Sequence, residues 1–398
     1  MNKKITVGIT LAFIFIAIAL TFTATMIYSM NLFDQKIVSI QERETMYDKI
    51  SQIDSFIRQN YYRQIDDSRI QDGLARGYIA GTGDDGIRYF TNQEYSRIIE
   101  AKSGKLCGIG VEHEVNASGY VQITEVHAST SAEKIGMEAG DTIVMVNDED
   151  ALELGADKVA EALYGAEGDE VTLTYTRDGL DYTFSFVYGM YETRSVASYD
   201  VEGYAYFRFS AFTLLTYDQF QEELAERLSS GEVRGLILDL RNSDGGYDLN
   251  VIAKIMDKLI GQCTMISGIY QGGYTKVLYT SDKEKVDLPT AVLVNGGTKG
   301  YSELFAAAMG ECDNVRIVGE QTCGSGTYGV FDQFTDGTAI YVPVCELLAC
   351  GSVRYNETGV TPDFVTASFD DFVLPDGAPS ILQDLQLRKA VEMLDSEF

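Results

Sequence analysis

The first feature of the chain is an uncharged, almost wholly apolar stretch over residues 5–30, which Lys3 and Lys4 precede. About 20 apolar residues are enough to cross a bilayer as a helix, and a positive flank favours a cytoplasmic N-terminus and an exported remainder. We therefore predict a signal-anchor transmembrane helix in residues 1–30. A cleaved signal peptide without a clear A-x-A site is the alternative. Both interpretations place the bulk of the chain outside the cytoplasm, and an uncleaved anchor makes it a single-pass protein of the cell membrane.

Residues 31–95 repeat their apolar positions at helical spacing, as Ile50 and Ile53 illustrate. Asp67 and Ser68 are typical of a helix N-terminus and precede a second stretch of the same kind. We expect an N-terminal helical region here, and no residue in it suggests catalysis.

In residues 96–190 the sequence pattern predicts a series of short strands. Two of them, Val171–Arg177 and Tyr182–Val187, alternate apolar and polar positions and lie close enough in sequence to pair as a hairpin. This pattern predicts a mainly β domain.

Residues 191–398 alternate apolar strands with helical stretches. The run Gly235–Arg241 is almost continuously apolar and ends in charge, which is typical of a strand covered on both faces. A second buried strand follows at Thr290–Asn295, after a helical stretch. Such alternation predicts an α/β core with a mixed sheet covered by helices.

Composition limits the partners and the chemistry of the 398-residue chain. Its formal net charge of -29 makes nucleic acid an unlikely partner, because a polyanion is repelled by phosphate backbones. The two histidines, His113 and His127, argue against a histidine-rich zinc site and leave a Ser-His-Asp triad few candidates. A serine protease of this composition would need another base, usually a lysine with a lowered pKa. We predict neither a metal nor a cofactor.

The six cysteines contain no C-x-x-C pair, so a ribbon-type metal site is unsupported. An exported chain can oxidise some of its thiols. The nearest pairs in sequence are Cys345 with Cys350 and Cys312 with Cys323. The alternative is that all six are small buried hydrophobic side chains.

The strand-rich region resembles a PDZ domain of the bacterial protease type. It contains a Gly-Ile-Gly-Val loop, an S-A-x-x-x-G-M-x-x-G-D segment at Ser131–Asp141 and a Val-Asn-Asp strand end. The loop residues are Gly108, Ile109, Gly110 and Val111. Glycines let backbone N–H groups converge into a nest for a terminal carboxylate, and an adjacent strand edge can accept a peptide. The resemblance implies binding of C-terminal tails of exported or membrane proteins; a merely tight loop is the alternative.

The region from about Ile40 to Leu394 resembles the C-terminal processing (tail-specific) serine proteases. The resemblance is carried by five segments in the family's order: Gly235–Gly246, Ala291–Glu303, Val318–Gly326, Gly359–Asp363 and Asp384–Leu394. It implies an α/β protease core with an inserted PDZ domain, and a catalytic serine whose proton a glutamine-oriented lysine removes. It also implies that backbone N–H groups stabilise the oxyanion. Those groups correspond to Gly245, Gly246 and Tyr301.

Three positions depart from the family's pattern. Where the family reads N-x-G-[ST]-A-S-A-S-E, residues 295–303 place Gly300 at the position of the nucleophilic serine. In the next motif, G-E-K-T-x-G-K-G-x-x-Q, Ser325 stands for the lysine and Gly329 for the glutamine. Asp244 replaces the proline of the turn. A missing nucleophile and base reduce catalysis by on the order of 10⁶-fold in other serine proteases.

Nearby residues offer limited replacements. Lys299 and Ser302 are the substitutes for the missing dyad, with Thr298 and Cys323 as further nucleophile candidates. We therefore expect a membrane-anchored pseudoprotease that binds tails through its PDZ domain. The alternatives are an active serine-type endopeptidase with a rearranged nucleophile, and a purely structural envelope protein.

Overall fold

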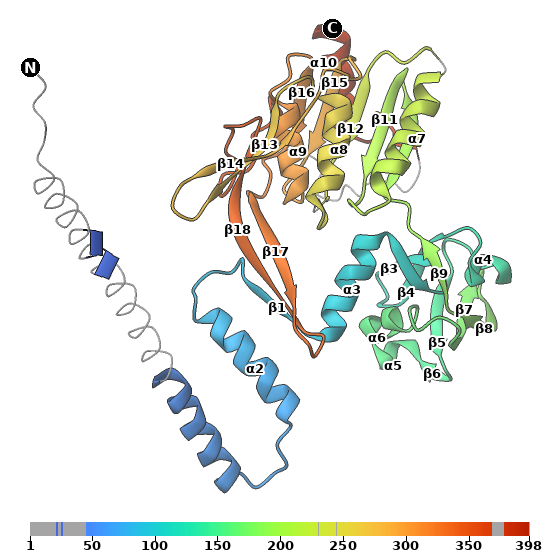
Figure 1. Ribbon diagram of the computed structural model, residues 1–398. Coiled ribbons are helices and arrows are strands. Elements are labelled where there is room, and N and C mark those ends of the chain that lie inside the picture. Colours follow the sequence, from blue (N-terminus) through green and yellow to red (C-terminus); the bar gives the residue numbers. More distant parts are fainter. Residues whose placement is uncertain are drawn as a thin grey trace, which may run out of the picture. The chain divides into compact units, whose positions relative to one another are not determined.

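The structure is a computed structural model that describes residues 21–22, 25–26, 45–229, 231–243, 245–367 and 378–397 (Figure 1). The anchor expected in residues 5–30 therefore lies almost wholly outside the described residues and stays a prediction. Within the described ranges, no helix combines the length and the apolarity needed to cross a membrane. The chain divides between Ala75 and Arg76 into two units.

The first unit is helical where it is described. Residues 45–60 form one helix, and helix α2 (Asp67–Ala80) begins in this unit. The side chain that caps α2 is Asp66, whose carboxylate accepts from the Ser68 and Arg69 N–H groups at 3.0 and 3.3 Å. The cap predicted at Asp67 and Ser68 is therefore one residue too late.

The second unit opens with a strand and a capped helix. Strand β1 (Arg88–Phe90) lies inside the region predicted to be helical, and it pairs antiparallel with β18 (Ala339–Ala349). Helix α3 (Asn92–Ser103) follows. Its N-terminus is closed by a capping box, in which Thr91 and Glu94 each accept the other's backbone N–H group.

The PDZ-like region is a β-sheet with its own core. Its strands follow the order β3 (Val111–Val115), β4 (Val121–Val126), β5 (Thr142–Val146), β7 (Glu170–Arg177) and β8 (Leu180–Val187), with β6 (Glu149–Asp150) beside β5. Three short helices accompany it: α4 (Ser131–Ile135), α5 (Ala151–Leu154) and α6 (Ala156–Glu161). A separate ribbon joins β2 (Lys105–Gly108) to β9 (Gly189–Glu192). The apolar positions of the sheet pack into one cluster around Ile109 and Phe186.

The main sheet of the second unit is mixed, as the sequence predicts. Its order is β10 (Val196–Val201), β11 (Tyr204–Phe209), β12 (Leu236–Asp239), β15 (Thr290–Val294), β16 (Val315–Gly319) and β19 (Phe364–Val365). Only the β10–β11 pair is antiparallel in this sheet, as far as the described strands show. Parallel strands buried on both faces explain the continuous apolar runs.

Helices cover both faces of this sheet (Figure 1). One core cluster joins one face to α7 (Thr216–Ser229), α8 (Leu249–Leu259) and α9 (Tyr301–Met309). A second cluster joins the opposite face to α10 (Leu385–Glu397). Three layers therefore hold the strand ends from which the candidate site is built.

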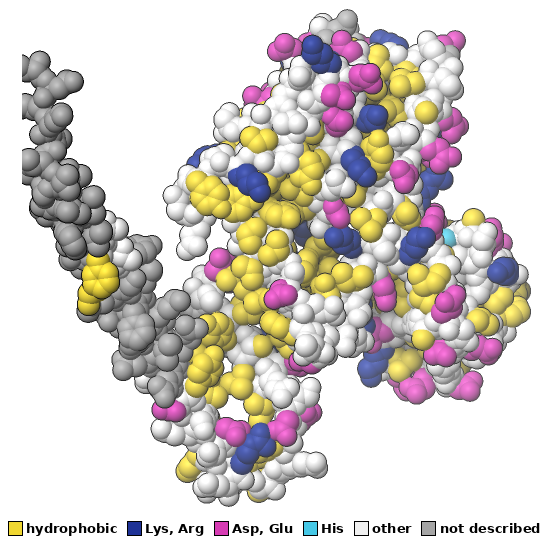
Figure 2. All heavy atoms as spheres, viewed as in Figure 1, with side chains coloured by type: hydrophobic (Ala, Val, Ile, Leu, Met, Phe, Trp, Pro, Cys, Tyr) yellow, Lys and Arg dark blue, Asp and Glu magenta, His cyan; other side chains and the backbone are white. Residues whose placement is uncertain are grey.

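A second sheet of the same unit extends the core. It contains β18 between β1 and β13 (Thr264–Tyr270), with β14 (Thr275–Thr280) beyond β13 and β17 (Thr327–Gln333) also paired to β18. On the face shown in Figure 2, Asp and Glu side chains are spread over the described surface, with Lys and Arg side chains standing between them. The acidic charge is thus distributed and not confined to one element.

A buried ion cluster ties α10 to the sheet. The Arg241 guanidinium donates to Asp239 at 2.9 Å and to Asp384 at 2.7 Å, and all three side chains are buried. The Asp384 carboxylate also accepts from the Gln386 and Leu387 N–H groups at the start of α10, at 3.0 Å each. One aspartate thus balances a buried cation and caps the last helix.

We expect Asp384→Ala to lower the free energy of unfolding by about 3–5 kcal/mol, because it leaves the buried Arg241 charge without one of its partners. Urea denaturation of the full chain measures the change. Glu392→Ala, on the exposed side of α10, should stay within about 0.5 kcal/mol of the parent protein. Equal effects of the two substitutions would contradict the role assigned to Asp384.

Candidate functional site

One buried carboxylate joins the two loops that carry the family's catalytic positions. Glu303, in the first turn of α9, is fully buried. One of its oxygens accepts from the Gly300 N–H at 3.1 Å and from the Ser325 N–H at 2.7 Å. The other accepts from the Thr322 hydroxyl at 2.5 Å and from the Gly324 N–H at 2.6 Å. The loop before α9 and the loop after β16 are therefore held side by side.

The two loops meet at a pocket of about 370 Å³. Gly300 and Ser325 both line it, so the structure brings the nucleophile and lysine positions together although they lie far apart in the sequence. The other lining residues come from several elements: Asp85, Gly86, Arg88, Gly246, Tyr247, Lys299, Tyr301, Thr327 and Tyr341. The pocket has the location of a catalytic centre without its reacting groups.

Gly300 has a backbone conformation that suits glycine. Its φ of 63° and ψ of -127° lie outside the regions that residues with a Cβ prefer. It stands immediately before the first residue of α9 and supplies no side-chain group to the pocket. A nucleophile restored at this position would have to be held in a strained conformation.

Ser325 offers no base. Its side chain is exposed, and its hydroxyl donates to the Cys323 sulfur at 3.6 Å. No lysine or histidine hydrogen-bonds to either of these side chains in the part of the chain that is described. The lysine position therefore carries a hydroxyl with nothing to activate it.

The suggested Lys299–Ser302 couple is not formed. Ser302 is fully buried, and its hydroxyl donates to the Ser243 hydroxyl at 2.8 Å. Lys299 is exposed and is held through its backbone N–H, which donates to the Ser243 carbonyl at 3.0 Å. Thr298 is buried as well, with its hydroxyl on the Leu240 carbonyl at 2.8 Å. These hydroxyls stabilise the loop and do not reach the pocket.

Tyr341 fills the space that belongs to the missing glutamine. A Cβ atom placed on Gly329 would lie 2.2 Å from the ring of Tyr341 and 2.5 Å from its hydroxyl oxygen. The opposite side of the ring faces the Arg88 guanidinium, 5.1 Å from the ring centroid. Burial raises the pKa of the Tyr341 phenol, so it stays neutral at physiological pH. Sequence motifs do not reveal this residue, because it lies on the neighbouring strand.

The predicted oxyanion donors lie together at the N-terminus of α9. Gly245 and Gly246 have φ values of 75° and 66°. A Cβ atom on Gly245 would lie 2.3 Å from the Tyr301 nitrogen, so only glycine allows the turn to pack against this helix end. Asp244, beside the turn, lies outside the described residues. The backbone scaffold of an oxyanion site is thus retained beside the empty nucleophile position.

The PDZ loop is tighter than the sequence pattern implies. Ile109 is fully buried, and its N–H donates to the Leu163 carbonyl at 3.0 Å. Gly110 has a φ of 87°, and a Cβ atom there would lie 2.2 Å from Thr130. Ile109 therefore cannot donate to a ligand as predicted. Gly110, whose N–H finds no acceptor among the described residues, and Val111 remain as donors.

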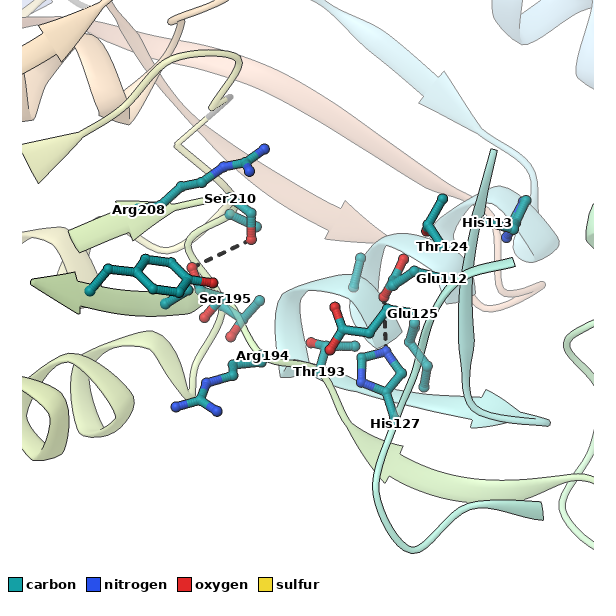
Figure 3. A pocket seen from close by; sticks show the side chains of 16 residues that line it. Glu112, His113, Thr124, Glu125, His127, Thr193, Arg194, Ser195, Arg208 and Ser210 are labelled. Atoms are coloured by element: carbon teal, nitrogen blue, oxygen red, sulfur yellow. Dashed lines mark hydrogen bonds and ion pairs between the residues drawn. The ribbon is translucent and has the colours of Figure 1, made fainter. Parts of the chain in front are cut away.

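Both histidines line a second pocket, of about 490 Å³ (Figure 3). His127 is held by Glu112, with the ring nitrogen and the carboxylate oxygen 3.0 Å apart. Burial lowers the pKa of His113. The Ser210 hydroxyl, across the pocket, donates to the Ser195 carbonyl at 3.4 Å. No serine hydroxyl is hydrogen-bonded to either histidine in the described ranges, so a Ser-His couple is absent there.

The described residues contain no group of three His, Cys, Asp or Glu side chains arranged to hold a metal ion.

Comparison with known proteins places this geometry in a family. Residues 203–366 match the model of peptidase family S41, and residues 122–177 match a PDZ domain. The carboxy-terminal processing protease CtpA of Bacillus subtilis is 26% identical over 343 residues, which cover 83% of this chain and 70% of that protein. A probable CtpA-like serine protease of Staphylococcus epidermidis strain RP62A is 25% identical over 356 residues, covering 87% and 70%.

A solved structure shares the fold. A putative S41 protease from Bacteroides fragilis NCTC 9343 superposes with a TM-score of 0.51 at 16% identity, over 80% of this chain and 88% of that one. The likeness concerns the arrangement of elements and leaves the chemistry of the pocket to be judged from its own residues.

Glu303→Gln should lower the free energy of unfolding by about 2–4 kcal/mol, because the new amide group faces N–H donors and leaves some of them unsatisfied in a buried place. Denaturation monitored by circular dichroism is a suitable measurement. Glu311→Gln is the matched control, since Glu311 is exposed just beyond α9. A loss for Glu303→Gln no larger than the control's would show that the carboxylate does not hold the loops.

Gly329→Gln should destabilise the core by about 1–3 kcal/mol, because the new side chain overlaps the Tyr341 ring. In a Tyr341→Ala background the same substitution should be close to neutral. A double-mutant cycle of unfolding free energies gives the coupling. Additive effects would mean that Tyr341 does not block the glutamine position.

Proposed function

Since the chain belongs to the C-terminal processing proteases of peptidase family S41 and carries a PDZ domain, we propose that it binds the C-terminal tails of exported or membrane proteins without cleaving them. The observation that carries this proposal is the emptied pocket. Gly300 supplies no nucleophile, and Ser325 supplies no base. Acyl transfer requires both groups in one geometry.

The pocket supports loss of catalysis more strongly than the motif alone. Three features oppose the family's chemistry: the missing side chain of Gly300, the exposed hydroxyl of Ser325 and the ring of Tyr341 in the place of the glutamine. Loss of nucleophile and base together leaves only the residual catalysis of oxyanion donors and binding, on the order of 10⁶-fold below an intact enzyme.

Capture of tails is supported by the strand edge and the loop of the PDZ domain. β3 is an edge strand of its sheet, so its free side can pair with an extended peptide. Gly110 and Val111 stand at the start of this strand, where a terminal carboxylate would be received. Main-chain pairing supplies affinity that depends little on sequence, and the carboxylate supplies selectivity for chain ends.

The proposed place of action is the outer side of the cell membrane. The uncharged stretch of residues 5–30, with Lys3 and Lys4 before it, supports a single-pass anchor with the bulk of the chain extracytoplasmic. Tails of proteins exported across the same membrane would then be within reach.

An active peptidase with a rearranged nucleophile is the second candidate. The observation in its favour is the exposed Cys323, whose sulfur accepts from the Ser325 hydroxyl beside the pocket. A thiol is a competent nucleophile only with a lowered pKa or an adjacent base. No such base contacts Cys323 within the described ranges, so we rank this candidate second.

The full chain in detergent micelles should bind a fluorescent peptide with a free C-terminus at least about tenfold more tightly than the same peptide amidated, because the amide removes the negative charge that the N–H nest recognises. An unstructured protein incubated with the same sample should remain intact. Fluorescence anisotropy and mass spectrometry give the two readouts.

Equal affinity for the two peptides would reject tail recognition through the carboxylate. Cleavage that disappears in Cys323→Ala or Ser325→Ala would establish the second candidate instead. Cleavage that survives both substitutions would point to a contaminating protease.

A further inference from the structure

Three cysteines that are distant in sequence gather at one end of the second sheet. Cys263 immediately precedes β13, and Cys350 immediately follows β18. These two strands pair antiparallel, with Ile266 opposite Ala349, and the Cys350 N–H donates to the Met265 carbonyl at 2.8 Å. The two cysteines therefore leave the ladder at the same end.

The side chains of Cys263 and Cys350 project to the same side of the sheet. Both side chains pack against the core cluster that contains α9. The Cys350 sulfur also lies 3.5 Å from the Ala308 carbonyl, and the Ser281 hydroxyl donates to the Cys263 sulfur at 3.5 Å.

Cys312, just beyond α9, is the third member of the cluster. Cys312 packs against the same core cluster as Cys263, and the Lys285 side chain lies close to it. Burial raises the pKa of the Cys350 thiol to about 12, and the neighbouring Cys263 and Cys312 add to the rise. The Cys312 and Cys350 thiols are thus protonated at neutral pH, a state that does not suit thiolate metal ligands.

The pairs suggested by sequence distance do not fit. Cys345 lies within β18 and is buried in the core, whereas Cys350 follows the end of that strand. Cys323 is exposed beside Ser325, whereas Cys312 is half-buried within the cluster. All six cysteines are free thiols in this structure, so the cluster is a reduced state.

We propose that Cys263 and Cys350 form a disulfide when the chain meets a disulfide oxidant. One thiolate attacks a sulfur of the oxidant, which releases one oxidant thiolate and leaves a mixed disulfide. The other cysteine then attacks the protein sulfur of that mixed disulfide and releases the second oxidant thiolate. The protein loses two electrons and two protons, and the oxidant is reduced to two thiols.

The bridge would close the loop that contains the whole candidate site. Residues 264–349 include Gly300, Glu303 and Ser325, together with β15 and α9. A cross-link across a long loop restricts the unfolded chain, which stabilises the folded one. An exported protein encounters an oxidising environment in which such a bond persists. The proposed disulfide therefore agrees with the proposed extracytoplasmic location, but its formation can be tested independently of that location.

The test incubates the full chain in detergent micelles with oxidised glutathione, alkylates the remaining thiols and maps the peptides without reduction. We expect a Cys263–Cys350 linked peptide, with Cys312 alkylated. The melting temperature should rise by about 5–10 °C and return to its former value with dithiothreitol. Cys263→Ser and Cys350→Ser should each abolish both signals, and Cys107→Ser, in the PDZ domain, should preserve both.

Absence of the linked peptide at every oxidant concentration would overturn the proposal, as would a bridge that includes Cys312 or Cys345. A thermal shift that persists in Cys350→Ser would do the same. Should a serine variant fail to fold, peptide mapping of the unsubstituted chain still decides the pairing. Neither result depends on tail binding or on cleavage, so failure here would leave the proposed function standing.

Discussion

The candidate site depends on a single buried carboxylate. Glu303 has no access to solvent, and a charge in such a place is costly unless donors surround it. Four hydrogen bonds from two loops meet this need. Because the carboxylate requires the donors as much as the loops require the carboxylate, the arrangement persists without any catalytic group. The hydrogen bonds of Glu303 therefore hold the two loops of the pocket together.

Other side chains pack around the positions where the family carries its reacting groups. The Tyr341 ring occupies the room of an orienting glutamine, and the Ser302 hydroxyl turns inward to Ser243. These contacts are part of the packing around the pocket, and each opposes the return of the original chemistry. The site thus departs from the family's pattern in its neighbours as well as in its named positions.

The PDZ loop has fewer free backbone N–H donors than its sequence pattern predicts. Burial of Ile109 commits its N–H to Leu163, which strengthens the start of the loop but removes one donor from the expected nest. Recognition of a tail then rests on Gly110, Val111 and the edge of β3. In the protease core, the clustered thiols of Cys263 and Cys350 lie at the ends of the segment that carries the site.

The sequence alone determined the classes of the elements and the order of the parts. Apolar periodicity depends on residues close in the chain, so the strands of the PDZ domain and the mixed α/β core could be predicted, and motif spacing located Gly300, Ser325 and Gly329. Tertiary structure decided what distant residues do to one another. Tertiary contacts between separate strands and loops place the Tyr341 ring over Gly329, bury Ser302 and engage the Ile109 N–H, and they bring Cys263 and Cys350 to one end of the β13–β18 pair. No local pattern encodes such contacts, because they arise only when the sheets form and bring these segments together.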